Sequence, residues 1–314
     1  MTQIEAQTIN SELLKSMPLP AYDDAANKSD YGKLLIIAGS RRLPGTAVLA
    51  ARAALRAGCG TVRVAAPMSV AMHIGLALPE LMVLPLPETV AGTIACSALA
   101  LIEAQYEPCD AAIIGPGLDE DEETAELCRH ITGSTPLPLL IDAQALTSLH
   151  KPKAAEYGTA AAPRVITPHP GEMGALSGRD VDDIESSREA TTHDFARKRG
   201  LTLVLKGRET LIGAPDGTMY RNTAGTRGLG TAGSGDVLAG IIGGLLAQKM
   251  DATHAAVWGV HMHALCGEAA AKDMGDDGLM AYDLIERLPN VQRYLRRLTS
   301  PRKDEAPAGL RRTG

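Results

Sequence analysis

One glycine-rich stretch carries the residue types that could perform phosphate chemistry. Residues 222–250 read NTAGTRGLGTAGSGDVLAGIIGGLLAQKM, where Gly233, Ser234 and Gly235 lead to Asp236 and then to an apolar segment. The apolar residues that follow have helical spacing, so the pattern predicts a helix that begins close to Asp236. The first amides of a helix lack intrahelical partners and lie at the positive end of its dipole. The stretch therefore predicts an anion hole formed by Gly233, Ser234 and Gly235.

Asp236 is the residue in this stretch that could move a proton. We expect the helix terminus to keep its carboxylate ionised, so that it can accept a proton from a substrate hydroxyl. In the alternative interpretation, Ser234 and Asp236 only cap the helix and the glycines form a flexible turn. GLGTAG at 228–233 also fits a dinucleotide-binding pattern, but it does not follow the strand of a strand–helix–strand unit.

Apolar runs that alternate with helix-like segments predict the elements that must position these residues. Such strict alternation implies a parallel sheet whose crossover helices cover both faces. Asp216-Gly217 lies between two short strand patterns in residues 210–222, which predicts a hairpin. The expected strands are 33–40, 61–67, 81–84, 111–115, 137–143, 164–170 and 201–207, and the expected helices lie near 46–57, 69–77, 91–105, 122–131, 144–149 and 182–199.

Polar residues gather where these strands end. Ligands of such a sheet bind beyond the carboxyl ends of its strands. The residues that we expect at this edge are Gly39, Ser40, 115–117, Asp142, His169, Glu172 and Lys206.

The composition indicates a globular protein and argues against one that binds nucleic acid. The hydrophobic content of 45% is ample for a buried core, whereas aromatic residues at 3% make base stacking an improbable mode of binding. A formal net charge of −6 argues against a nucleic-acid surface. The five cysteines contain no C-x-x-C pair, which is typical of reduced thiols in a cytoplasm and indicates no zinc site.

The chain has no segment that we expect to enter a membrane. Its first twenty residues lack a basic start followed by an apolar core, and its longest apolar run, 237–247, is too short to span a bilayer. We expect residues 1–30 to form an N-terminal extension, residues 31–297 to form one domain, and residues 298–314 to be a disordered tail.

The order of six motifs resembles that of the ADP/ATP-dependent NAD(P)H-hydrate dehydratases, a branch of the ribokinase-like superfamily. The resemblance covers roughly residues 30–295. It implies a ribokinase-like three-layer α/β/α fold, with a mainly parallel central sheet and a small β-hairpin. It also implies a lyase that repairs hydrated nicotinamide cofactor. The motifs are YGKLLIIAGS, IGPGL, PLLIDAQAL, VITPHPGEMGAL, LVLKGRETLI and GTAGSGDVLAGIIGGLLAQ.

The resemblance assigns roles to individual residues. Asp236 matches the catalytic aspartate, and Glu172 matches an acidic residue that orients water bound to Mg²⁺. The implied co-substrate is ADP or ATP, and the bacterial branch favours ADP. The implied nucleotide contacts are Lys206, Gly207, Arg208, Glu209, Thr210 and Gly235, and the implied contacts to the hydrated cofactor are Thr46, Gly117, His169 and Asp236.

Several of these residues also have simpler interpretations. His169 between two prolines could be part of a rigid turn, and Lys206 could be a solvated strand end. Asp142 could equally be a structural acceptor or lie near the phosphates. His261, His263 and Cys266 fit a helix core or surface better than a metal site.

The chain also departs from the usual family wording. Gln144 replaces a second Asp, Thr46 an alanine and Asp119 a glycine, while AGSGD replaces GGTGD. The changes at Thr46 and Asp119 would alter individual contacts to the substrate. Gly233, Gly235 and Asp236 match the family's residues at their positions.

The functional hypothesis is nucleotide-dependent dehydration of NADHX and NADPHX. A small-molecule kinase of the same superfamily is the nearest alternative, and a nucleotide sensor without turnover is a second. The family suggests a homotetramer. An epimerase domain fused to this module in many bacteria has no counterpart here, so we expect the epimerase to be a separate protein.

Overall fold

One mixed sheet forms the centre of the molecule. The computed structural model describes residues 5–21, 27–28, 30–149 and 162–299. Within these residues ten strands follow the order β1-β10-β9-β8-β7-β6-β5-β2-β3-β4, and all except β9 run in the same direction. The strands are β1 (Ala6–Thr8), β2 (Lys33–Ile37), β3 (Thr61–Pro67), β4 (Met82–Leu86), β5 (Ala111–Ile114), β6 (Leu139–Ile141), β7 (Arg164–Ile166), β8 (Thr202–Leu205), β9 (Thr210–Gly213) and β10 (Met219–Asn222).

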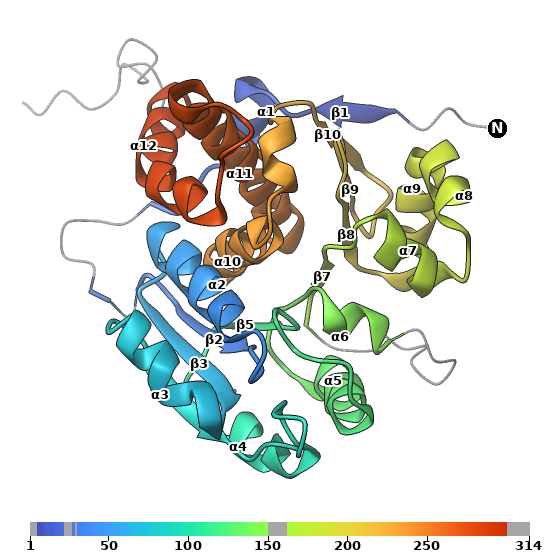
Figure 1. Cartoon of the computed structure of the whole chain (residues 1–314). Helices are drawn as coiled ribbons and strands as arrows, with labels where there is room; N and C mark the ends of the chain where they lie inside the picture. Colours follow the sequence, from blue (N-terminus) through green and yellow to red (C-terminus); the bar gives the residue numbers. More distant parts are fainter. Residues whose placement is uncertain (1–4, 22–26, 29, 150–161, 300–314) are drawn as a thin grey trace, which may run out of the picture.

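Helices cover both faces of the sheet, which confirms the three-layer α/β/α prediction (Figure 1). One face carries α1 (Ser11–Ser16), α2 (Pro44–Arg56), α3 (Met68–Ala77), α10 (Ser234–Ala247), α11 (Ala252–Met274) and α12 (Ala281–Thr299). The other carries α4 (Leu99–Glu103), α5 (Glu122–Ser134), α6 (Gln144–Thr147), α7 (Pro170–Ser177), α8 (Val181–Ser186) and α9 (Arg188–Arg199).

Alternate residues of the strands feed two separate hydrophobic cores. In β2, Leu34 and Ile36 pack with the α2 and α10 side, whereas Leu35 and Ile37 pack with the α5 side. This alternation follows from the period of two in a strand, because successive side chains point to opposite faces. A strand that is apolar at every position therefore has both faces covered.

Helix α10 is buried on all sides rather than along a single stripe, since 13 of its 14 residues are buried. Its glycines allow this close packing. A Cβ at Gly240 would lie 2.2 Å from the carbonyl oxygen of Ala50 in α2, and one at Gly243 would lie 2.4 Å from Ile113 Cδ1. The glycines therefore let α10 lie against both α2 and the sheet.

The hairpin predicted around Asp216-Gly217 is confirmed. β9 and β10 are antiparallel, Gly217 has φ +94°, and the Asp216 carboxylate accepts a hydrogen bond from the Thr218 amide at 2.8 Å. β9 also pairs antiparallel to β8, which the expected alternation of parallel strands did not include.

Two predicted helices are shorter or interrupted. The helix expected near 91–105 is a 3-10 turn at Cys96–Ala98 followed by α4. The helix expected at 182–199 breaks into α8 and α9 at Ser187, whose backbone leaves the helical region at φ −135°. The hydroxyl of Ser187 bonds to the carbonyl of Asp183 at 2.6 Å, a local side-chain bond that competes with the helical ladder.

The N-terminal segment contributes more than we expected. β1 pairs with β10, and the side chain of Leu14 in α1 is fully buried. Trp258 of α11 donates its indole N–H to the carbonyl of Met17 at 2.6 Å. Residues 6–17 thus complete the sheet and the core beside α11.

The C-terminal helix α12 extends to Thr299, and residues 300–314 of the predicted tail lie outside the described residues. No helix in the described part of the chain has the length and apolarity needed to cross a bilayer.

Candidate active site

The N-terminus of α10 meets the carboxyl ends of β6 and β8. A Cβ built on Gly235 would lie 3.8 Å from Lys206 Nζ and 4.0 Å from Asp142 Oδ2. Lys206 follows β8 and Asp142 follows β6, so the predicted phosphate-chemistry residues come together at one edge of the sheet.

The first turn of α10 presents two amides without a main-chain acceptor. The Ser234 amide bonds to the Thr231 carbonyl at 3.3 Å, and the Val237 amide bonds to the Gly233 carbonyl at 3.1 Å. The amides of Gly235 and Asp236 have no acceptor among the described residues. Of the predicted anion-hole residues, Ser234 thus has its amide engaged within the turn, whereas the amide of Gly235 is available to a ligand.

His263 of α11 supports this turn from within the core. Its Nε2 lies 3.0 Å from both the hydroxyl and the carbonyl oxygen of Ser234. Burial lowers the pKa of His263 to about 4, so the imidazole is neutral near pH 7. The interpretation of His263 as a core residue is confirmed, and His261 likewise pairs with Asn222, at 2.9 Å.

Asp236 is 9% exposed, and its pKa is raised to about 7. Burial is the main cause and the carboxylate of Asp142 adds to it, while Lys206 acts in the opposite direction. The prediction that the helix terminus keeps Asp236 ionised holds only in part, because burial and a like charge raise its pKa and leave both forms populated near pH 7. A carboxyl group with this pKa can take up and release a proton near neutral pH, as a general base must.

Lys206 joins two carboxylates. Its Nζ lies 3.2 Å from Asp142 Oδ1 and 3.5 Å from Glu172 Oε2. Burial alone would lower the pKa of Lys206, but these two carboxylates raise it overall, so the ammonium stays charged. The ammonium of Lys206 is therefore fixed by two carboxylates, and the side chain is not a freely solvated group at the end of a strand. Asp142 also accepts from the Thr167 hydroxyl at 2.7 Å, which makes it a structural acceptor that faces the α10 terminus as well.

The backbone around Asp142 is closely packed and strained. Ala143 has φ +49°, which a residue with a Cβ rarely adopts. A Cβ at Gly115, whose φ is +124°, would lie 1.8 Å from the Asp142 carbonyl oxygen. Glycine at position 115 is thus required for the ends of β5 and β6 to lie so close together.

His169 and Glu172 form a capping box at the start of α7. His169 Nδ1 accepts from the amides of Gly171 and Glu172 at 3.0 and 3.2 Å, while Glu172 Oε2 accepts from the His169 amide at 2.8 Å. The rigid-turn interpretation of His169 is therefore correct at its Nδ1. With Nδ1 accepting, Nε2 carries the proton. Nε2 lies 3.6 Å from Glu172 Oε1, and the side chain is 55% exposed, so a ligand can reach this N–H.

Thr46 and Gly117 lie side by side. A Cβ at Gly117 would lie 1.9 Å from Thr46 Oγ1, which itself donates to the Leu43 carbonyl at 2.8 Å. Asp119 pairs with Arg42 at 3.6 Å. Gln144 lines a cavity of about 270 Å³ together with 120–122, Ala125, Arg129, Thr147 and Ser148.

The side chains of the Lys206–Thr210 loop diverge beyond Lys206. Gly207 and Arg208 are exposed, and Glu209 pairs with Arg221 at 2.9 Å. Thr210 begins β9 opposite Asn222. The structure therefore brings Lys206 to the α10 terminus, whereas the side chain of Glu209 is engaged at the hairpin.

Acidic residues on and after α11 hold the glycine-rich loop, and the sequence interpretation missed them. Glu268 accepts from the Gly225 amide at 2.8 Å. Asp276 accepts from the Thr226 hydroxyl and from the Gly228 amide, the latter at 3.3 Å. The sequence shows only isolated carboxylates at these positions, and nothing in it indicates which backbone groups they contact.

The donor set around Lys206 does not form a direct metal cage. No group of three or more His, Cys, Asp or Glu side chains in the described ranges could hold a metal ion. Mg²⁺ commonly keeps most of its water and takes its other ligands from substrate phosphates. The carboxylate of Glu172, 13% exposed, fits contact with such a hydrated ion.

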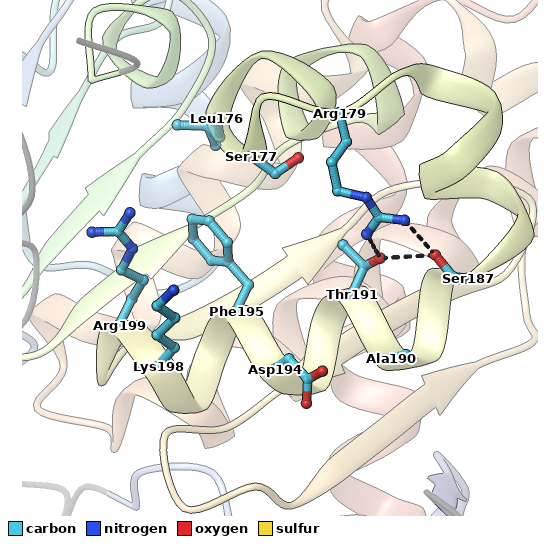
Figure 2. A pocket seen from close by; sticks show the side chains of 10 residues that line it. All are labelled: Leu176, Ser177, Arg179, Ser187, Ala190, Thr191, Asp194, Phe195, Lys198 and Arg199. Carbon is cyan, nitrogen blue, oxygen red and sulfur yellow. Dashed lines mark hydrogen bonds between the residues drawn. The ribbon is translucent and has the colours of Figure 1, made fainter. Parts of the chain in front are cut away.

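A cavity of about 440 Å³ lies apart from this edge, between α7 and α9 (Figure 2). Its lining includes Leu176, Phe195 and Lys198, and none of the residues predicted to do chemistry. Volume alone therefore does not locate the chemistry, and the convergence of Asp236, Lys206 and the free amides does.

Comparison with known proteins gives a consistent result. The family model described as NAD(P)H-hydrate dehydratase matches residues 34–290. The ADP-dependent (S)-NAD(P)H-hydrate dehydratase of Xanthomonas campestris is 39% identical over 291 residues, which is 93% of this chain and 98% of that protein.

Of two further relatives, one is a longer, bifunctional enzyme and the other has a solved structure. The bifunctional NAD(P)H-hydrate repair enzyme of Thermofilum pendens is 38% identical over 93% of this chain, which spans only 56% of that enzyme. The crystal structure of the Bacillus subtilis ADP/ATP-dependent NAD(P)H-hydrate dehydratase, co-crystallised with ATP and Mg²⁺, superposes with a TM-score of 0.81. It is 28% identical, and the match covers 93% of this chain and 100% of that one.

Proposed function

We propose a reaction for this chain from the premise that it belongs to the NAD(P)H-hydrate dehydratase family. The chain converts NADHX and NADPHX to NADH and NADPH, and ADP supplies the phosphoryl group and leaves as AMP. The observation that carries the proposal is the convergence of a titratable carboxyl group, a held lysine and two free amides at one helix terminus.

In the first step, the C6 hydroxyl of the hydrated nicotinamide attacks the terminal phosphorus of the nucleotide. Asp236 accepts the hydroxyl proton, and the bond from phosphorus to the bridging oxygen breaks to release AMP. The amides of Gly235 and Asp236 and the ammonium of Lys206 stabilise the charge on the transferred phosphoryl group. The pKa of about 7 suits Asp236 to this role, because the carboxylate form is present at neutral pH and holds a proton well.

In the second step, the C6–O bond breaks and phosphate departs. The lone pair of the ring nitrogen supplies the electrons for this cleavage. Loss of a proton from C5 then restores the C5=C6 double bond of the dihydronicotinamide. Phosphorylation has converted hydroxide, a poor leaving group, into phosphate, a good one.

The remaining predicted residues hold the two substrates. His169 donates from Nε2 to the hydrated cofactor, and Thr46 and Gly117, which lie against each other, contact the same substrate. Mg²⁺ carried by the nucleotide would neutralise phosphate charge, with Glu172 facing its bound water. The names of two relatives, which specify ADP or ATP and NAD(P)H-hydrate, support the choice of these two substrates.

A single incubation tests the proposal. The protein is mixed with NADHX and either ADP or ATP, and both the absorbance of reduced nicotinamide and the release of phosphate are followed. A dehydratase restores the absorbance and releases one phosphate for each cofactor repaired. A control without nucleotide shows neither signal.

The alternatives give different results in the same assay. A kinase that accepts this hydroxyl would consume the nucleotide without restoring the absorbance, and a kinase for another alcohol would give no signal. A sensor would bind ADP in calorimetry with no turnover. Any of these outcomes would contradict the proposed reaction.

Two further features support a cellular compartment and an oligomeric state for this enzyme. The five cysteines are free thiols, which supports a reducing compartment such as the cytoplasm. Exposed Met68, Met72 and Leu76 form an apolar stripe along α3 next to the edge strand β4, and a second copy of the chain in a homotetramer would cover it. Sedimentation of Met72→Glu tests this, because dissociation is expected.

A further inference from the structure

Arg188, the first residue of α9, reaches into the loop that carries Lys206. Its Nη2 lies 3.1 Å from the carbonyl oxygens of both Leu205 and Lys206 and 3.0 Å from that of Glu209. The side chain is 17% exposed, and its Nη1 pairs with Glu185 at 3.3 Å. A guanidinium is suited to this position because it is planar, always charged and carries several donors.

The guanidinium of Arg188 occupies the place that a side chain at position 207 would take. A Cβ at position 207 would lie 2.5 Å from Arg188 Nη2 and 2.9 Å from its Cζ, closer than real side chains approach. A side chain at position 207 would therefore displace the guanidinium from this place.

The contact also decides which way the loop amides point. In a trans peptide the carbonyl and the next N–H point in opposite directions, and the described chain contains no cis bond. Because the Lys206 carbonyl points at Arg188, the Gly207 N–H points away from it. This N–H has no acceptor among the described residues, so it is available to a ligand on the side opposite Arg188.

A polar cluster at the α8–α9 junction holds the residue that precedes Arg188. Arg179 donates to the hydroxyls of Thr191 at 2.8 Å and Ser187 at 2.9 Å (Figure 2). It also donates to the Asp183 carbonyl at 3.0 Å. Ser187 directly precedes Arg188. The guanidinium therefore extends from a rigid corner and not from a mobile loop.

We propose that Arg188 is a positioning residue for nucleotide binding: it draws the carbonyls of the Lys206–Glu209 loop inward, so that the Gly207 N–H and the Lys206 ammonium face the phosphates of ADP. The proposal rests on the proposed function, which places the nucleotide along this loop. Arg188 acts through the loop, and its effect is confined to the nucleotide.

The test compares Arg188→Ala with Lys198→Ala, which removes a positive charge from an exposed position on the same helix. We expect Arg188→Ala to raise the ADP dissociation constant and the ADP KM about 10- to 100-fold, because an unordered loop must be ordered on binding. The turnover number and the KM for NADHX should change less than about threefold, since these depend on contacts that remain. Lys198→Ala should match the wild type.

A double-mutant cycle with Gly207→Ala gives an independent readout. In the wild-type background the added methyl displaces the guanidinium, and ADP binding should weaken about tenfold. In the Arg188→Ala background the space is free, and the same change should have less than about a twofold effect.

These outcomes separate the two proposals. An equal Gly207→Ala effect in both backgrounds, or an Arg188→Ala affinity equal to that of Lys198→Ala, would overturn the role of Arg188. Failure of the wild-type protein to dehydrate NADHX would overturn the proposed function, while the ADP affinities could still be compared by calorimetry. If Arg188→Ala does not fold, Arg188→Lys serves. The lysine side chain is one bond shorter and has a single nitrogen, which cannot meet the three carbonyls and Glu185 at once, so weaker ADP binding is still expected.

Discussion

Replacing Asp236 with asparagine should abolish turnover and at the same time stabilise the protein at high pH. The pKa of Asp236 is about 7 in the folded chain and 3.8 in the unfolded reference. Between these two values the native state binds the proton more tightly than the unfolded state. Stability contributed by this group therefore falls as pH rises from about 4 to about 7. Above that range the native protein carries the full cost of a buried carboxylate.

The size of the effect follows from the pKa difference. A shift of about 3 units corresponds to at most about 4 kcal/mol at pH 8, and loss of the attraction to Lys206 in the variant reduces the gain. With an unfolding entropy of about 2.1 cal/mol/K per residue, a gain of about 2–4 kcal/mol raises Tm by roughly 3–6 °C. Asparagine cannot ionise, so the gain should shrink steadily and vanish near pH 4.

The activity should change in the opposite direction. General-base catalysis contributes about 10²–10⁴-fold, so Asp236→Asn should lose at least that factor in turnover of NADHX. ADP should still bind, because the amides and Lys206 are unchanged. In the wild type, kcat/KM should rise with pH through about 7 and then level off, since the carboxylate is the active form.

Two measurements check this reasoning together. Tm is recorded between pH 5 and 8 for the wild type and Asp236→Asn, beside steady-state turnover. Asp121→Asn is the control, because it replaces a residue that caps α5 with another good capping residue. A Tm difference that does not depend on pH, or turnover within tenfold of the wild type, would refute the buried-base assignment and favour a simple helix cap.

Three further substitutions test other parts of the site and the fold. Lys206→Ala should raise the ADP KM more than it lowers kcat, because a phosphate contact present throughout the reaction is uniform binding; an unchanged ADP KM with lost kcat would contradict this. His169→Ala should weaken NADHX but not ADP in calorimetry and cost about 1 kcal/mol through the lost α7 cap, whereas His169→Asn should keep the cap and the Tm. Gly240→Ala should destabilise by about 1–3 kcal/mol in denaturant titration through overpacking against Ala50, while Gly133→Ala, with open space around it in α5, should be neutral or slightly stabilising.

Much of the fold is legible in the sequence because its signals are local. The continuous apolar run at 34–37 predicts a strand with both faces covered, and the two cores on either side of β2 confirm it. Asp216-Gly217 predicts its hairpin from turn chemistry alone. The glycine loop followed by helical spacing predicts the α10 terminus, and parallel strands send Asp142 and Lys206 to the same edge.

The tertiary structure decided the properties that depend on remote neighbours. The pKa of Asp236 reverses the expectation from its helix terminus, because it depends on burial and on Asp142 at the end of another strand. The β1 strand pairs with β10, and no hydrophobic periodicity in the sequence predicts this pairing. Arg188 holds the carbonyls of a loop up to 21 positions away. Periodicity and turn signals describe a residue and its chain neighbours, whereas burial, charge proximity and loop orientation arise only when distant segments pack.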